Sequence, residues 1–105
     1  MHIQILNFQL NDIDDQQYRQ DCDECAPAFA EVPGLISKIW LADPSTNTYG
    51  GVYTWASRDK MDEYAKSDLF RAVASNPNLA GIISIDFGVL EDPTTVTRGL
   101  AEVHA

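Results

Sequence analysis

A polar turn between two strand-like runs constrains the fold more than any other feature of this sequence. Residues 35–42 and 49–56 have the composition of strands, and the segment DPSTNT between them predicts a hairpin. Pro33-Gly34 would stop a helix that precedes the hairpin, and Ser57 is a suitable N-cap for one that follows it. We therefore expect a helix on each side of the hairpin.

The first helix follows an N-terminal strand. Residues 2–10 alternate with period two, which predicts a strand, and Asp12 or Asp14 then supplies an N-cap. Pro27 is expected to kink or divide this helix. Apolar side chains recur at spacings of three and four and form one stripe, which comprises Tyr18, Cys22, Cys25, Phe29 and Val32.

The second helical region is followed by a last strand. It carries Met61 and Tyr64, restarts at SDLFRAVA with Leu69, Phe70 and Val73, and stops at Asn76-Pro77. Residues 81–90 predict the fourth strand, and the tail after Asp92-Pro93 has room for one or two helical turns. A tail of this kind would suit an embrace of a second subunit.

The order of elements is βαββαβ, which is the α+β arrangement called ferredoxin-like: an antiparallel four-stranded sheet with both helices on one face. We expect one domain over residues 1–105, of which 93–105 form the C-terminal tail. The other face of the sheet would be bare, and a second copy of the chain is the simplest cover for it. A homodimer is therefore expected.

Composition excludes several classes of partner. The chain has 105 residues, of which 45% are apolar, but no apolar run approaches the roughly 20 residues that cross a bilayer. The net charge of -9 opposes binding to nucleic acid or to an anionic membrane. The N-terminal residues alternate in polarity and lack an export signal, so we expect a cytoplasmic protein. No nucleotide-binding loop or nucleophile elbow is present.

The hairpin brings most of the aromatic side chains together. Pairing Trp40 with Gly51, Lys38 with Tyr53 and Ile36 with Trp55 keeps the aromatic and aliphatic sets apart, whereas a slip of one residue mixes them. One face then carries Lys38, Trp40, Tyr49, Tyr53 and Trp55, and the other carries Leu35, Ile39, Leu41, Val52 and Thr54. We expect the aliphatic set to pack against the helices and the aromatic set to occupy the bare face.

The faces of the first and fourth strands stay open at this point. The first strand contributes to the aromatic face either Ile3, Ile5 and Asn7 or Gln4, Leu6 and Phe8. The fourth contributes either Ile83, Ile85 and Phe87 or Ile82, Ser84 and Asp86.

The motif PG-x-x-x-K-x-W, the polar turn and the following GGVYTW resemble the YdhR-type family of putative monooxygenases in the dimeric α/β-barrel superfamily, whose better-known members are antibiotic-biosynthesis monooxygenases. The resemblance covers most of the chain and is clearest over residues 33–64. LNFQLN at residues 6–11 is similar to the first strand of the family, but Asn7 stands where a histidine can occur. This departure argues against a histidine-based mechanism.

The resemblance implies a homodimer with a pocket in each subunit between sheet and helices. It also implies oxygenation of an electron-rich, small aromatic or quinone-like metabolite without flavin, haem or metal. Under this hypothesis Lys38 stabilises a phenolate or enolate and Asn7 anchors the ligand by hydrogen bonds. The ligand-binding side chains would be Trp40, Tyr53, Trp55, Phe70 and Tyr49.

Less specific interpretations compete with these assignments. The aromatic side chains can form a core or an interface with no ligand, and Lys38 can pair with an acid such as Asp86. CDEC resembles a redox motif, but it lies inside a helix among acids and on the apolar stripe, so buried core cysteines are expected. The protein is then a cofactor-free monooxygenase, a non-catalytic small-molecule-binding dimer, or an interaction module whose aromatic face is filled by its partner.

Overall fold

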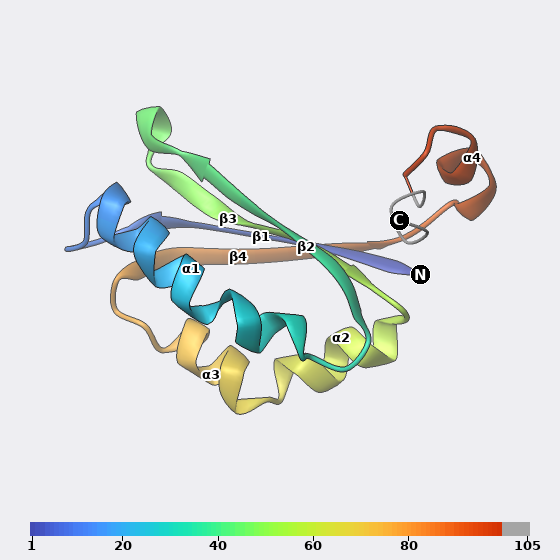
Figure 1. Cartoon of the computed structure of the whole chain (residues 1–105), viewed down its shortest axis with the longest axis horizontal. Helices are drawn as coiled ribbons and strands as arrows, with labels where there is room; N and C mark the ends of the chain where they lie inside the picture. The colour runs from blue at the N-terminus through green and yellow to red at the C-terminus, as the bar shows by residue number, and fades with distance from the viewer. Residues whose placement is uncertain (100–105) are drawn as a thin grey trace.

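The computed structural model describes residues 1–99 and shows the ferredoxin-like fold. The four antiparallel strands have the order β2-β3-β1-β4, as the sequence predicts. Figure 1 shows α1, α2 and α3 on one side of the sheet and α4 beyond its end. The elements are β1 (His2–Leu10), α1 (Asp15–Ala30), β2 (Leu35–Asp43), η1 (Pro44–Thr46), β3 (Thr48–Trp55), α2 (Arg58–Ala65), α3 (Asp68–Ala74), β4 (Leu79–Gly88) and α4 (Glu91–Val96).

Side-chain caps begin the three helices that cover the sheet. Asp14, one of the two expected caps of α1, accepts a hydrogen bond from the backbone N–H of Gln17 at 2.8 Å. Ser57 caps α2 and Ser67 caps α3 in the same way. Each cap satisfies one of the backbone donors that a helix leaves without a partner in its first turn.

Pro27 does not divide α1, which runs on to Ala30. The proline lies in the last turn, where the single hydrogen bond that its missing N–H removes is less costly than in the helix centre. The chain then turns at Gly34, which has a φ of +83°. A side chain at this position would also collide with the stem of Lys60.

The register of the hairpin agrees with the prediction at Trp40 and Gly51 and at Lys38 and Tyr53. It departs at the start of β2, where Leu35 rather than Ile36 lies opposite Trp55. A bulge between Leu35 and Ser37 accounts for the difference, because it places one extra residue on β2.

The aromatic face of the sheet is the one that the helices cover, so the prediction of a bare aromatic face is wrong. Phe29 of α1 packs edge-on against Trp40, with ring centroids 5.3 Å apart. Tyr64 of α2 lies against Trp55 at 5.2 Å, and Trp55 is completely buried. The helices contribute aromatic side chains of their own, and rings at these separations attract one another beyond simple burial.

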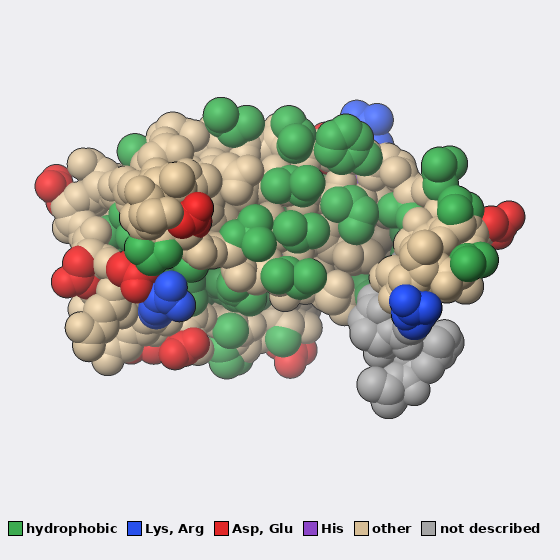
Figure 2. All heavy atoms as spheres, turned by 90° about the horizontal axis from the view of Figure 1, so that it is seen from above, with side chains coloured by type: hydrophobic (Ala, Val, Ile, Leu, Met, Phe, Trp, Pro, Cys, Tyr) green, Lys and Arg blue, Asp and Glu red, His purple; other side chains and the backbone are tan. Residues whose placement is uncertain are grey.

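Most of the aliphatic set occupies the opposite face instead of packing against the helices. Leu35 is the exception: the bulge places it opposite Trp55, and it packs against the core. One row crosses all four strands, with Ile39 next to Val52, Val52 next to Ile5 and Ile5 next to Ile85. Ile39 is 61% exposed and Ile85 48%. Figure 2 shows apolar side chains gathered over the middle of this face. An apolar patch of this kind marks an interaction site.

The faces of the first and fourth strands are now resolved. Gln4, Leu6 and Phe8 of β1 are buried on the helix-covered face. Gln4 accepts a hydrogen bond from the indole N–H of Trp55 and donates one to Ser84, both at 3.0 Å. Because Ser84 reaches Gln4, β4 turns the set Ile82, Ser84 and Asp86 toward the helices.

The C-terminal part of the described chain forms α4, which begins at Glu91 and therefore includes Asp92-Pro93. The amino group of Met1 lies 3.1 Å from the Glu91 carboxylate. The expected tail extends to residue 105, and its last six residues lie outside the described ones. No helix within residues 1–99 is long and apolar enough to cross a bilayer.

Candidate functional site

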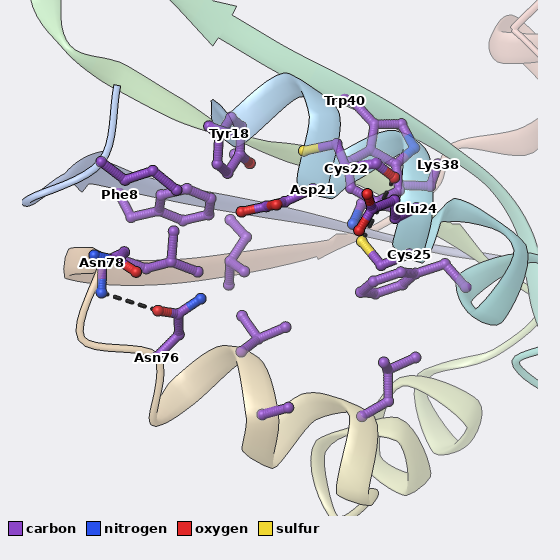
Figure 3. A pocket seen from close by; sticks show the side chains of 18 of the residues that line it. Phe8, Tyr18, Asp21, Cys22, Glu24, Cys25, Lys38, Trp40, Asn76 and Asn78 are labelled. Carbon is purple, nitrogen blue, oxygen red and sulfur yellow. Dashed lines mark hydrogen bonds between the residues drawn. The ribbon is translucent and has the colours of Figure 1, made fainter. Parts of the chain in front are cut away.

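A cavity of about 430 Å³ lies between the helix-covered face of the sheet and the helices α1 and α3. This volume falls within the range of about 300 to 1,000 Å³ that is usual for small-molecule sites. Figure 3 shows side chains from both layers pointing into it. Its walls are mostly apolar and comprise Leu6, Phe8, Ile13, Tyr18, Cys22, Cys25, Phe29, Trp40, Gly50, Tyr53, Leu69, Ala72, Val73 and Leu79; the polar lining residues are Asp21, Glu24, Lys38, Asn76 and Asn78.

Lys38 of β2 places its ammonium group in a cage of three aromatic rings. Its Nζ lies 3.4 Å from the ring centroid of Trp40, 3.6 Å from that of Phe29 and 4.7 Å from that of Tyr53. A cation at such distances is attracted by the negative faces of the rings. The side chain of Lys38 passes over Gly51, which leaves room for it because a Cβ there would lie 2.9 Å from Cε of Lys38.

The charge of Lys38 is poorly compensated in this cage. Burial lowers the pKa of Lys38 to about 8, although the thiols of Cys25 and Cys22 act in the opposite direction. Among residues 1–99 no ion pair involves Lys38. The partner suggested from sequence, Asp86, bonds instead to His2 at 2.6 Å. Asp86 lies on β4, at the opposite edge of the sheet from β2.

Both cysteines of CDEC line the cavity and neither is in a disulfide. Cys22 and Cys25 lie on the sheet-facing side of α1, as the apolar stripe predicted, but they are half-buried at the cavity rather than buried in the core. Burial raises the pKa of both thiols, so they stay protonated at neutral pH. The sequence argument against a low-pKa redox thiol therefore agrees with the electrostatics of the site.

Two tyrosines of the cavity are held in their neutral form. Burial raises the pKa of Tyr53 to about 12, and burial followed by contact with Cys22 raises that of Tyr18. Tyr18 also packs edge-on against Phe8 and Tyr49. These phenols can therefore act as hydrogen-bond donors rather than as bases at neutral pH.

Polar side chains enter the cavity from its outer parts. Asp21 and Glu24 of α1 are exposed, and Asp21 accepts a hydrogen bond from Gln17 at 2.9 Å. At the opposite wall the side chain of Asn76 accepts a hydrogen bond from the backbone N–H of Asn78 (Figure 3). The cavity thus has acids on one side, amides on the other and one amine inside.

The structure brings only part of the predicted site together. Lys38, Trp40 and Tyr53 line the same cavity. Tyr49, Trp55 and Phe70 do not line it, although all three pack within the adjoining core.

Asn7 lies on the opposite face of the sheet from Lys38, because it alternates with the buried Leu6 and Phe8. Its amide lies 3.4 Å from the backbone oxygen of Tyr49. The pairing of Lys38 and Asn7 in one active site therefore does not occur within a subunit.

Sequence analysis missed much of the α1 wall as part of a site. Tyr18, Cys22, Cys25 and Phe29 all line the cavity. Their 3.6-residue periodicity placed them together on one stripe, but it identified that stripe only as core. They could have been found by noting that this stripe and one face of the hairpin both carry aromatic side chains.

Within residues 1–99 no group of three or more His, Cys, Asp or Glu side chains is arranged to hold a metal ion.

The fold is ferredoxin-like with a cavity between the sheet and the helices, and comparison with known proteins assigns it to a family. The family model described as "Putative mono-oxygenase ydhR" matches residues 3–100. The chain therefore belongs to this family, as the hairpin motif indicated. No curated protein matches the sequence.

Solved structures with this fold include several enzymes. The haem-degrader MhuD from Mycobacterium tuberculosis, solved with two haems in its active site, is 20% identical, with a TM-score of 0.70 over 88% of this chain and 98% of that one. SnoaB, a cofactor-independent oxygenase from Streptomyces nogalater, is 16% identical, with a TM-score of 0.66 over 86% and 94%.

A dimeric ferredoxin-like protein of unknown function from Thermobifida fusca is 21% identical, with a TM-score of 0.66 over 85% and 92% of the two chains. At these identities the likenesses establish the fold and not the chemistry.

Proposed function

We propose that the protein is a cofactor-independent monooxygenase that acts, as a cytoplasmic homodimer, on a small aromatic or quinone-like metabolite. The observation that carries this proposal is the amine of Lys38 held among three rings in an otherwise apolar cavity. Family membership and the likeness to SnoaB support oxygen chemistry.

The chemistry requires an electron-rich anion of the substrate. A planar phenol or anthrone would stack on the rings and transfer a proton to the neutral form of the Lys38 amine. The ammonium that results would stabilise the phenolate or enolate. The apolar walls strengthen this interaction because they exclude water. In the case of an anthrone, the enolate reduces dioxygen directly: the ring methylene becomes a carbonyl that keeps one oxygen atom, and the second oxygen atom leaves as water with the two methylene hydrogens.

Oxygen uptake in the presence of anthrones and hydroquinones tests the proposal. We expect uptake that saturates with substrate and falls by at least about tenfold in Lys38→Met, because the anion loses its counter-charge. Trp40→Ala should weaken binding through loss of a stacking wall. Lys66→Met, at an exposed position on the same protein, should behave like the original chain. Uptake that is unchanged in Lys38→Met would refute the proposed role of Lys38.

A non-catalytic small-molecule-binding dimer is the second candidate. It is favoured by the absence of histidine from the cavity lining within the described residues, since histidine is the commonest general base. Ligand binding should quench the fluorescence of Trp40 in both cases. Saturable quenching by a ligand that causes no oxygen uptake would therefore support the binding protein over the oxygenase.

The exposed aliphatic face of the sheet supports the homodimer. Closing two copies over the row that contains Ile5 and Ile85 would remove these exposed apolar side chains from water. The dimeric ferredoxin-like protein from Thermobifida fusca has a similar fold. In this arrangement Asn7 lies at the subunit interface rather than in the cavity of its own subunit.

We predict that Ile85→Lys converts the dimer into monomers, because a buried ammonium without a partner costs several kcal/mol. Light scattering coupled to size exclusion gives the mass directly. Ala28→Lys, which adds the same charge at an exposed position of α1, is the matched control and should stay dimeric. A dimer of unchanged affinity in Ile85→Lys would place the interface elsewhere.

A further inference from the structure

The amine of Lys38 differs from the other amines of the described chain in its surroundings. Lys60 pairs with Glu63, the amino group of Met1 pairs with Glu91, and Lys66 is exposed. Lys38 lines a cavity, and its Nζ contacts three aromatic rings. Among residues 1–99 this amine is in no ion pair and no side-chain hydrogen bond. An amine in such a place is a candidate nucleophile as well as a counter-charge.

We propose that Lys38 forms a reversible imine with aromatic aldehydes and aryl ketones that enter the cavity. The cavity of about 430 Å³ has room for a carbonyl compound of one or two fused rings. The rings of Trp40 and Phe29 lie within 4 Å of Nζ. An aryl group that stacks on them therefore places its carbonyl carbon next to the amine.

The reaction needs no oxidant, reductant or cofactor. The lone pair of Nζ attacks the carbonyl carbon, and the carbonyl oxygen takes up a proton to give a carbinolamine. This intermediate loses water as the C=N bond forms, and water re-enters to release the aldehyde. The neutral phenols of Tyr53 and Tyr18 line the same cavity as possible proton donors.

The aromatic cage suits the imine as well as the free amine. A protonated imine carries its positive charge at the same nitrogen, so it keeps the attraction of the surrounding ring faces. The apolar walls also limit the water that would hydrolyse it. Exposed lysines have neither advantage, and this difference predicts selectivity for Lys38.

The protonation state of Lys38 supports the same conclusion. Because burial lowers its pKa to about 8, about a tenth of the amine is neutral at pH 7, against less than about a thousandth for an exposed lysine. The other titratable side chains that line the cavity are Tyr18, Asp21, Cys22, Glu24, Cys25 and Tyr53. Burial raises the pKa of both cysteines, so at neutral pH the thiols compete weakly as nucleophiles.

Reductive trapping tests this inference without any assay of oxygen chemistry, so its result stands apart from the proposed oxygenase. The folded protein is treated at pH 7 with 2-naphthaldehyde and cyanoborohydride, and the adducts are located by intact mass and peptide mapping. We expect one naphthylmethyl group on Lys38, formed at least about tenfold faster than on Lys60 or Lys66; peptide mapping separates it from any adduct on the α-amino group of Met1. Lys38→Arg, which keeps the positive charge, should lose this adduct.

Two further measurements make the result decisive. Unfolding the original chain in urea should abolish the preference for Lys38, because selectivity depends on the cavity. Between pH 7 and pH 10 the ratio of adduct on Lys38 to adduct on Lys66 should fall, since the neutral fraction of Lys38 levels off above about pH 8. Even labelling of all amines in the folded protein, or a Lys38 that stays unlabelled, would overturn the inference. If butanal, an aliphatic aldehyde, labelled Lys38 with equal selectivity, the inference that the site prefers aromatic carbonyl compounds would be wrong.

Discussion

Gly50→Ala is expected to prevent folding or to lower the free energy of unfolding by more than about 4 kcal/mol. Gly50 has a φ of +154°, which side-chain-bearing residues rarely adopt. A Cβ at this position would lie 1.8 Å from the backbone oxygen of Leu6 and 3.0 Å from Cα of Asn7. Neither neighbour can move aside easily, because both belong to β1, which pairs with β3 and β4 in the middle of the sheet.

Urea denaturation followed by tryptophan fluorescence measures this effect, since Trp55 is completely buried in the folded chain. Gly88→Ala is the matched control, because a Cβ there meets nothing within 4 Å and the change should stay within about 0.5 kcal/mol. A Gly50→Ala protein with the original midpoint would show that β1 and β3 do not approach each other as described.

The order of the elements along the chain and most of the hairpin register could be predicted because they depend on local chemistry. Asp14, Ser57 and Ser67 stand where helices begin, and Gly51 opposite Trp40 fixes the register of the hairpin. The bulge at the start of β2 was not predictable, because nothing in the residues 35–37 distinguishes a bulged strand from a regular one. Pro27 predicted an interruption of the helix, but α1 continues to Ala30 because the proline lies in its last turn.

The covered face could not be decided from the strands alone. Periodicity separates two sets of residues but does not state which set meets the helices. The aromatic stripe of α1, with Tyr18 and Phe29, decides the matter through contacts that lie far apart in sequence. The sequence of β1 does not show which of its faces the helices cover, since both faces are largely apolar. For this reason Asn7 was assigned to the Lys38 site, although it lies on the other face of the sheet.

The sequence could predict only those residues of the site that lie on the hairpin of β2 and β3. Lys38, Trp40 and Tyr53 follow from the register of β2 and β3, and all three line the cavity. The wall supplied by α1 and α3 depends on how the helices lie over the sheet. Function in this fold is thus encoded partly in local pairing and partly in packing between layers.

Lys38→Met is expected to stabilise the folded protein by about 1 to 3 kcal/mol at pH 7 while it removes the proposed chemistry. The pKa of Lys38 is about 8 in the folded chain against 10.5 for a free lysine side chain. Because the folded pKa is the lower one, the charged form is penalised by folding. At pH 7 both states carry the proton, so the whole penalty is present; a methionine of similar length fills the same space without charge.

The pH dependence distinguishes this cause from better packing alone. As pH rises above about 8 the folded chain releases the proton before the unfolded chain does, so the original protein should gain about 1 kcal/mol between pH 7 and pH 9.5. Lys38→Met should show no such gain. Tyr53, whose pKa is raised to about 12, opposes stability only above about pH 10, where tyrosine ionises in the unfolded chain.

Urea denaturation at a series of pH values, with Lys66→Met as the control for loss of an exposed lysine, separates these contributions. A Lys38→Met protein that is less stable at pH 7 would mean that attraction of the ammonium to Trp40 and Phe29 outweighs the cost of its burial. A Lys38→Met protein that is more stable but inactive would show that the buried amine serves chemistry, because the folded state is more stable without it.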